Sequence, residues 1–279
     1  MRIVTYRGEG GDRAGVLVGE GVVDAWNALG GDGSTVRELL ASGSVEEVRT
    51  AAESAPTVPL ADIELLPPVP DPDKIVCIGL NYRSHAAEAG IDPPETPTFF
   101  AKFRNALAPP GTTVPLPAAS GKVDFEAEVA FVIGRECHDV ETDEARSYVA
   151  GYMLFNDLSA RDLQFATPQW MPGKVFDGSA PCGPALVTPE EGEVDGSISF
   201  SLELNGEVMQ DASTDDLIFG FPELVAHLSR LMTLQPGDVV STGTPSGVGS
   251  TRDPRVWLKA GDEIAISSPT LGRLETRLA

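Results

Sequence analysis

The sequence has few basic residues and few cysteines, and both shortages limit what the protein can do. It contains 20 Lys and Arg against 42 Asp and Glu, a formal charge of −22. This acidic excess repels nucleic acid and anionic membrane surfaces, so neither is expected as a partner. The three cysteines, Cys77, Cys137 and Cys182, are scattered and form no CxxC motif. That pattern is typical of a reducing compartment with incidental thiols.

Long apolar runs are also missing. No stretch approaches the roughly 20 apolar residues of a membrane span, and the N-terminal residues lack the apolar core of a signal peptide. We therefore expect a cytoplasmic protein. The 279 residues, with 42% hydrophobic content, suffice for one large domain or for a large and a small one.

Proline indicates where the chain divides. Residues 67–73 are proline-rich and predict a stiff, extended linker. Before it, residues 1–66 show short strand patterns with glycine-rich turns, followed by two helical patterns, which predicts a small accessory domain. After it, residues 74–279 are predicted to form a second, larger domain. Its patterns predict helices over residues 142–150 and 221–231, a helical turn over 158–164 and a hairpin at Asn205-Gly206, and from residue 194 onward they are mostly typical of strands.

The most informative segment is residues 123–133, an apolar, β-branched run that contains Asp124, Glu126 and Glu128. In a strand alternate side chains share a face, so the three acids should point the same way. Such a face is stable only in water or around a cation. Oxygen ligands without His or Cys favour Mg²⁺, Mn²⁺ or Ca²⁺ over zinc. The alternative is a solvated acidic face on a very acidic protein.

Two helical segments add polar groups. Within residues 81–90, His85 and Glu88 are three apart and would share a helix face, where the carboxylate would orient the imidazole as a general base. An exposed polar pair is the alternative. In residues 157–164, Asp157, Arg161 and Gln164 recur at spacings of four and three. They predict a metal ligand beside a carboxylate clamp, or else a plain surface pair.

Two lysines and a glycine-rich loop complete the candidate residues. Lys102 is a lone cation in an apolar run, where a side chain either reaches solvent or faces an anion. Lys174 starts an irregular Gly/Pro-rich loop, a kind of segment that carries function. Residues 242–249 are rich in glycine but lack the Gly-Lys-Ser/Thr of a nucleotide-binding loop, although their backbone donors could hold a carboxylate.

Together these segments resemble the fumarylacetoacetate hydrolase family. The matching segments, in chain order, are 78–82 with His85 and Glu88, 123–128, 156–162 with Gln164, 173–174 with 176–177, and 242–245 with 247–249. The resemblance implies an α+β, mostly β fold: a layered β-roll catalytic domain with a small N-terminal α+β domain. It also implies a homodimer.

The resemblance assigns roles to individual residues. It implies a metal site of Glu126, Glu128 and Asp157 that holds Mg²⁺ or Mn²⁺, with Ca²⁺ as an alternative, while Asp124 lies nearby without being a ligand. No organic cofactor is expected. His85 and Glu88 match the water-activating pair, and Lys174 would stabilise charge on the substrate. The residues expected to bind the substrate are Tyr82, Lys102, Arg161, Gln164 and Thr244.

The implied substrate is a 2-oxo or dicarboxylic acid. The first hypothesis is hydrolysis of a C–C bond in an acylpyruvate such as fumarylpyruvate, with a pyruvate enolate as the leaving group. The alternatives are decarboxylation of oxaloacetate or a related β-keto acid, isomerisation of an unsaturated 2-hydroxy dioate, and a non-catalytic metal- or ligand-binding role. Residues 104–105 and 169–172 depart from the family pattern and are not assigned.

Overall fold

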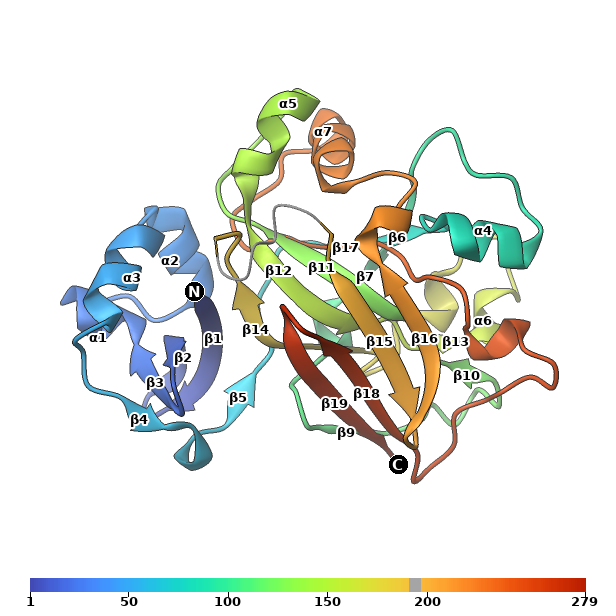
Figure 1. Ribbon diagram of the computed structural model, residues 1–279, viewed down its shortest axis with the longest axis horizontal. Coiled ribbons are helices and arrows are strands. Elements are labelled where there is room, and N and C mark those ends of the chain that lie inside the picture. The colour runs from blue at the N-terminus through green and yellow to red at the C-terminus, as the bar shows by residue number, and fades with distance from the viewer. Residues whose placement is uncertain (191–196) are drawn as a thin grey trace.

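Strands dominate the architecture of the computed structural model, which describes residues 1–190 and 197–279 (Figure 1). This confirms the predicted α+β, mostly β class. The N-terminal elements are β1 Arg2–Gly8, β2 Gly11–Val18, β3 Gly21–Asp24, α1 Ala25–Leu29, α2 Val36–Ser42, α3 Val45–Ala52, β4 Val58–Pro59 and β5 Leu65–Leu66. The C-terminal region that was predicted to be mostly strands begins at residue 194, which lies outside the described residues.

The remaining elements follow the proline-rich segment. The strands are β6 Ile75–Gly79, β7 Thr98–Lys102, β8 Leu107–Ala108, β9 Thr113–Val114, β10 Val123–Asp124, β11 Ala127–Ile133, β12 Val149–Asn156, β13 Ser159–Ala160, β14 Ala180–Val187, β15 Ser199–Leu204, β16 Glu207–Ser213, β17 Val239–Ser241, β18 Glu263–Ser268 and β19 Gly272–Leu278. The α-helices are α4 Arg83–Ala89, α5 Thr142–Ala145, α6 Arg161–Gln164 and α7 Phe221–Leu231. Single 3-10 turns are η1 Leu60–Asp62, η2 Arg104–Ala106, η3 Arg146–Tyr148, η4 Met171–Gly173, η5 Thr214–Asp216 and η6 Gly249–Thr251.

One large sheet runs through both parts of the chain. Its strand order is β4-β3-β2-β1-β14-β12-β11-β17-β6-β7, with β5 beside β1 and β8 beside β14. The N-terminal strands join the rest where Arg2 and Ile3 of β1 pair with Val187 and Leu186 of β14. A second sheet has the order β16-β15-β18-β19-β9, and β10 pairs with β13 alone. The N-terminal unit thus extends the catalytic sheet.

Strand β11 lies at the centre of this arrangement, between β12 and β17, and all seven of its residues are buried. Its odd-numbered residues Val129, Phe131 and Ile133 pack into a core that includes Phe200, Ile266 and Leu274 of the second sheet. Its even-numbered residues 130 and 132 pack into a core shared with the N-terminal helices. A strand covered on both faces explains the nearly continuous apolar sequence.

Three sequence-based element predictions need correction. The strand over residues 123–133 is interrupted at residues 125–126, which separates β10 from β11. The helix expected over 142–150 ends at Ala145 and starts from Glu141 rather than from a Thr142 cap, because residues from Val149 onward join the sheet as β12. The helical turn expected from residue 158 starts only at Arg161, because Ser159 and Ala160 pair with β10.

Other predictions are confirmed. Helix α7 has the bounds expected from its amphipathic pattern, and α4 ends at Gly90, whose φ of 66° suits a left-handed cap. The Asn205-Gly206 turn joins β15 to β16 with positive φ at both residues, which favours this hairpin sequence. Among the described residues, no helix is long and apolar enough to cross a membrane.

Asp24 connects β1, β2 and α1 of the N-terminal unit through hydrogen bonds, so its replacement should lower the stability of the fold. Its carboxylate accepts from Arg13 Nε at 2.7 Å, from the Tyr6 hydroxyl at 2.7 Å and from the Asn27 N–H at 2.8 Å, where it caps α1. Burial raises the pKa of Asp24, but these donors outweigh burial and leave the pKa below its ordinary 3.8. The folded chain therefore binds this proton more weakly than the unfolded chain does.

Asp24→Asn should lower the free energy of unfolding by about 1 to 2 kcal/mol at neutral pH, because a charged cap and ion pair are lost. The stabilisation from Asp24 is fully present above its unfolded pKa and is lost as the pH falls below that value and through the lower folded pKa. Urea titrations at neutral and acidic pH test this. The wild-type advantage should shrink in acid, and an advantage independent of pH would contradict the role of the charge.

Candidate active site

Three buried carboxylates meet where β11 and β12 lie side by side. Glu126 precedes β11, Glu128 lies in it, and Asp157 follows β12. The two strands are antiparallel with Ala127 opposite Asn156, and the Asp157 N–H donates to the Glu126 carbonyl at 3.0 Å. One oxygen from each of the three carboxylates lies within 4.8 Å of the others. This acidic triad matches the predicted metal site, and none of its residues is more than 6% exposed.

The triad fits a hard divalent cation. It offers only oxygen ligands, and such ions are held by carboxylate oxygens. Glu128 accepts from two neutral donors, the Ser241 hydroxyl and the Gly243 N–H, the latter at 2.9 Å. Burial and the nearby charges of Asp157 and Glu126 raise the pKa of Glu128 well above its usual value. A cation among the three oxygens would relieve that repulsion.

Two lysines neutralise part of the triad. Lys174 Nζ lies 2.8 Å from both Glu126 Oε2 and Asp157 Oδ2, and Lys102 Nζ lies 2.6 Å from Asp157 Oδ1. Burial lowers the pKa of Lys174, but the charges of Asp157 and Glu126 outweigh it, so the pKa is raised. Burial acts against ionisation of Glu126, yet Lys174 and Arg161 hold its pKa at about 2. Glu126, Asp157 and the two lysines thus form a buried network of ion pairs.

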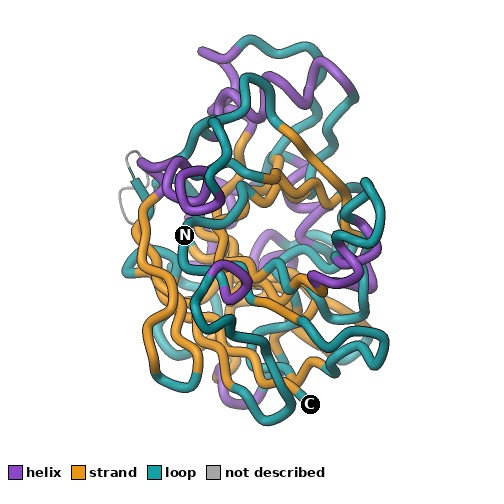
Figure 2. Tube along the Cα trace, turned by 90° about the vertical axis from the view of Figure 1, so that its right-hand side faces the viewer, coloured by secondary structure: helices purple, strands orange, loops and turns teal. Residues whose placement is uncertain are grey.

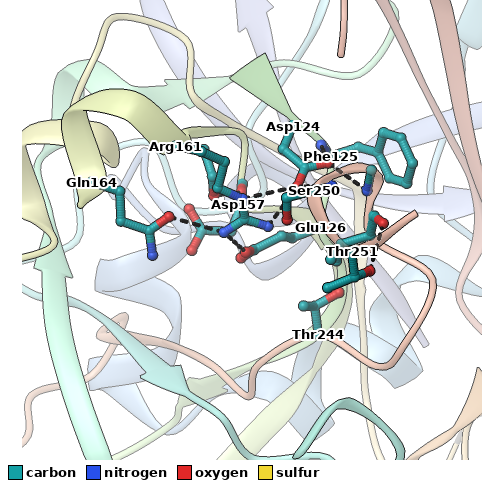
Figure 3. Close-up of polar contacts among 12 residues, drawn as sticks. Asp124, Phe125, Glu126, Asp157, Arg161, Gln164, Thr244, Ser250 and Thr251 are labelled. Carbon is teal, nitrogen blue, oxygen red and sulfur yellow. Dashed lines mark hydrogen bonds and ion pairs between the residues drawn. The ribbon is translucent and has the colours of Figure 1, made fainter. Parts of the chain in front are cut away.

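Arg161 connects this network to a glycine-rich loop. Its guanidinium lies 2.6 Å from Glu126 Oε1, donates to Gln164 Oε1 at 2.9 Å, and donates through Nε to Asp124 Oδ2 at 2.8 Å. Asp124 also accepts from the N–H groups of Gly249 and Ser250 at 2.7 and 3.1 Å. Figure 3 shows Arg161 between Gln164 on one side and Asp124 on the other.

The alternating strand pattern predicted that Asp124 would point toward the same cation site as Glu126 and Glu128. The structure differs, because Asp124 lies outside the triad and pairs with Arg161. The break after β10 turns it toward Arg161 and the loop. Its position outside the triad agrees with what the family resemblance implies.

The predicted base lies on α4, on the side of the molecule that Figure 2 faces. His85 Nδ1 is 3.3 Å from Glu88 Oε2, and Glu88 Oε1 accepts from the Gly247 N–H at 3.0 Å. The predicted pair of His85 and Glu88 is therefore present, and Glu88 also contacts the glycine-rich loop. His85 lines the same cavity as Glu126 and Glu128.

That cavity has a volume of about 220 Å³. Its polar lining comprises His85, Glu126, Glu128, Arg161, Gln164, Lys174, Thr244, Ser250 and Thr251. Its apolar lining comprises Ile78, Leu80, Ala89, Ile91, Phe100, Phe165 and Trp170, with Gly79. A charged floor, a histidine and an apolar wall thus face one space, an arrangement that suits a small organic acid.

Two predicted substrate-binding residues lie outside this lining. Tyr82 is fully buried in the hydrophobic core, where its ring meets Phe200 edge-on at 6.3 Å. The Lys102 side chain has no exposed area and contacts Asp157, so it orients a triad member. Thr244 does line the cavity, and its hydroxyl donates to the Ala127 carbonyl at 3.0 Å.

Sequence reasoning missed several residues that support the site. Gln210 accepts from the Ala127 N–H at 2.9 Å and donates to Thr244 at 2.9 Å, which connects the second sheet to the site. Nothing in its sequence context signals this contact. Ser241 ends β17 directly before the glycine-rich loop, and that position could have suggested its role beside Glu128. The apolar wall was missed because its residues come from separate segments.

Comparison with known proteins agrees with the site. The family model for the fumarylacetoacetate (FAA) hydrolase C-terminal domain matches residues 74–279, the part of the chain that follows the proline-rich segment. Among curated relatives, "Oxaloacetate tautomerase Fahd2a, mitochondrial" from Rattus norvegicus is 40% identical over 225 residues, which cover 80% of this chain and 72% of that protein.

Solved structures show the same fold. A fumarylacetoacetate hydrolase from Exiguobacterium antarcticum superposes with a TM-score of 0.88 at 30% identity, covering 100% of this chain and 99% of the other. A maleylpyruvate hydrolase from Sphingobium sp. SYK-6, solved in complex with manganese(II) and pyruvate, gives a TM-score of 0.82 at 28% identity with the same coverage. The matched family model, these relatives and the buried triad together show that the chain belongs to the fumarylacetoacetate hydrolase family of enzymes.

Proposed function

We propose that this protein is a divalent-metal-dependent enzyme that moves a proton at carbon 3 of a 2-oxo acid, and that it interconverts the keto and enol forms of oxaloacetate. The observation that carries the proposal is a histidine, His85, that lines the same cavity as the carboxylate triad. The 40% identity to an oxaloacetate tautomerase supports the substrate. This reaction needs a base and a group that makes the C–H acidic, but no attacking water.

The metal belongs at the triad. Glu126, Glu128 and Asp157 would hold Mg²⁺ or Mn²⁺, ions that prefer oxygen ligands. When bound, such an ion supplies a Lewis acid that withdraws electron density from the 2-oxo group and acidifies the neighbouring carbon. The manganese in the similar maleylpyruvate hydrolase structure supports this choice of ion.

His85 is the proposed base. The Glu88 carboxylate, 3.3 Å from His85 Nδ1, can only accept a hydrogen bond, so it favours the neutral imidazole with its proton on Nδ1 and with Nε2 as the free acceptor. Nε2 would take the proton from carbon 3 and return it to oxygen or carbon. Glu88 is held in turn by the Gly247 N–H, which fixes the orientation of the imidazole.

Lys174 supplies positive charge next to the reacting group. It lines the cavity, and its raised pKa keeps it protonated throughout the physiological range. An ammonium fixed beside the triad stabilises negative charge that develops on the substrate oxygen. Arg161 and Gln164 complete this polar end of the cavity.

Hydrolysis of an acylpyruvate is the second candidate, and the full-length similarity to a maleylpyruvate hydrolase favours it. The same residues would serve, with His85 taking its proton from a water molecule instead of from carbon. Products distinguish the two reactions. Tautomerisation leaves the carbon skeleton intact, whereas hydrolysis releases pyruvate and a second acid.

Removal of a triad carboxylate should weaken metal binding and slow turnover together. Glu126→Gln is expected to weaken Mn²⁺ binding, measured by calorimetry, and to slow loss of the oxaloacetate enol absorbance at least roughly a hundredfold. Glu263→Gln, at an exposed carboxylate on β18, is the matched control. Activity that survives exhaustive chelation in the wild type would contradict the proposal.

His85→Ala should leave Mn²⁺ affinity near the wild-type value, because His85 is not one of the triad ligands. The loss of the base should lower kcat by a factor of roughly 10² to 10⁴. Exchange of the carbon 3 hydrogens for deuterium, followed by NMR, measures the proton transfer directly. Exchange at the wild-type rate in His85→Ala would remove the histidine from the mechanism.

Product analysis decides between the two candidates. With acetopyruvate and Mn²⁺, a tautomerase should exchange the carbon 3 hydrogens without net release of acetate, and a hydrolase should release acetate and pyruvate in equal amounts. Both are quantified in one NMR time course. Stoichiometric acetate formed at the rate of exchange would favour hydrolysis over the first proposal.

A further inference from the structure

One wall of the active-site cavity has no assigned role. Six large apolar side chains line the cavity beyond the carboxylate triad: Ile78, Leu80, Ile91, Phe100, Phe165 and Trp170. Trp170 belongs to the segment 169–172, which the family resemblance leaves unassigned. The proposed proton transfer uses none of these side chains.

Two aromatic side chains in contact with each other lie at the centre of this wall. Trp170 meets Phe100 edge-on with ring centroids 5.9 Å apart. A Cβ added at Gly79 would lie 2.3 Å from ring carbon Cζ3 of Trp170, so the glycine leaves the space that the indole occupies. Phe100 also lies under the Lys174 ammonium, at 5.0 Å from ring centroid to Nζ. The apolar wall therefore begins directly beside the proposed reacting centre.

The mouth of the cavity leaves apolar surface exposed. Phe165 is 66% exposed and Ile91 is 52% exposed, and both line the cavity. Water contact with such side chains is unfavourable, and an apolar ligand group that covered them would gain free energy.

The charged residues of the cavity lining also favour an apolar ligand group over an anionic one. Its two permanently basic residues, Arg161 and Lys174, both lie at the triad and are already paired with carboxylates. Apart from His85 and the two triad glutamates, the remaining polar lining residues are neutral: Gln164, Thr244, Ser250 and Thr251. His85 is occupied as the proposed base. A second carboxylate that lay against the aromatic pair of Trp170 and Phe100 would therefore lose water without gaining a cationic partner among the lining residues.

We propose that the site prefers 2-oxo acids whose chain beyond carbon 4 is uncharged and apolar, an alkyl or aryl substituent that lies against Trp170, Phe100 and Phe165. The proposal rests on the proposed function for the position of the 2-oxo acid head, which the triad end receives. Oxaloacetate, which ends at carbon 4, would occupy only that end. The apolar wall then selects among longer substrates.

Two inert ligands with the same head test this preference. N-butyl oxamate and N-(3-carboxypropyl) oxamate both carry an oxamate head, but the second ends in a carboxylate. Calorimetry with Mn²⁺ present should show the butyl compound binding roughly tenfold more tightly, because it buries methylene groups and leaves no unpaired charge. Trp170→Ala should weaken butyl oxamate roughly tenfold and leave unsubstituted oxamate unchanged.

A charge placed at the mouth provides the second test. Phe165→Lys should reverse the order of the two ligands by giving the carboxylate a partner. Leu231→Lys, at a leucine that is 57% exposed at the end of α7, should leave the order unchanged. Equal or tighter binding of the carboxylate-ended ligand to the wild type overturns the inference while the proposed function stands. Absence of oxamate binding together with absence of oxaloacetate turnover overturns both.

Discussion

The repulsion among three buried carboxylates is the interaction on which the rest of the structure depends. Glu126, Glu128 and Asp157 place their oxygens within 4.8 Å of one another in a region almost closed to water. Such a cluster is stable only with compensating charge. Lys102, Lys174 and Arg161 supply part of it, and a divalent cation would supply the remainder. Because each compensating group comes from a different segment, the cluster also connects β7, α6 and the residue after η4 to β11 and β12.

The two sides of the cavity differ in how firmly they are held. The triad lies on central strands that are covered on both faces, so the positions of its oxygens are set by the packed sheet. His85 lies on a helix of seven residues. Its imidazole is oriented by Glu88, and Glu88 in turn accepts a hydrogen bond from the Gly247 N–H. The glycine-rich loop contacts both sides, through Gly247 to the base and through Gly249 and Ser250 to Asp124. The loop thus connects the segment that carries His85 to the residues beside the triad.

The same arrangement explains why relatives are named for different reactions. Proton transfer at carbon and attack by water both need an electron-withdrawing end, a fixed ammonium and one base. The first two lie on the charged floor, which this chain holds with buried ion pairs, and the proposed base, His85, lines the same cavity from α4. In our proposal, discrimination among substrates depends on the cavity wall, whose aromatic residues come from outside the motifs of the floor. The proposed chemistry and the proposed selectivity thus belong to separate parts of one cavity.

Local patterns in the sequence determined the strand-rich class, the bounds of α7, the 205–206 hairpin and the pairing of His85 with Glu88, because these depend on neighbours along the chain. Motif order further indicated the triad. Only the tertiary structure decided that Asp124 turns to Arg161, that Lys102 supports Asp157 and that Trp170 packs on Phe100. The physical reason is that each of these contacts joins residues 37 to 70 positions apart in the chain, and periodicity contains no information about which distant strands will pair.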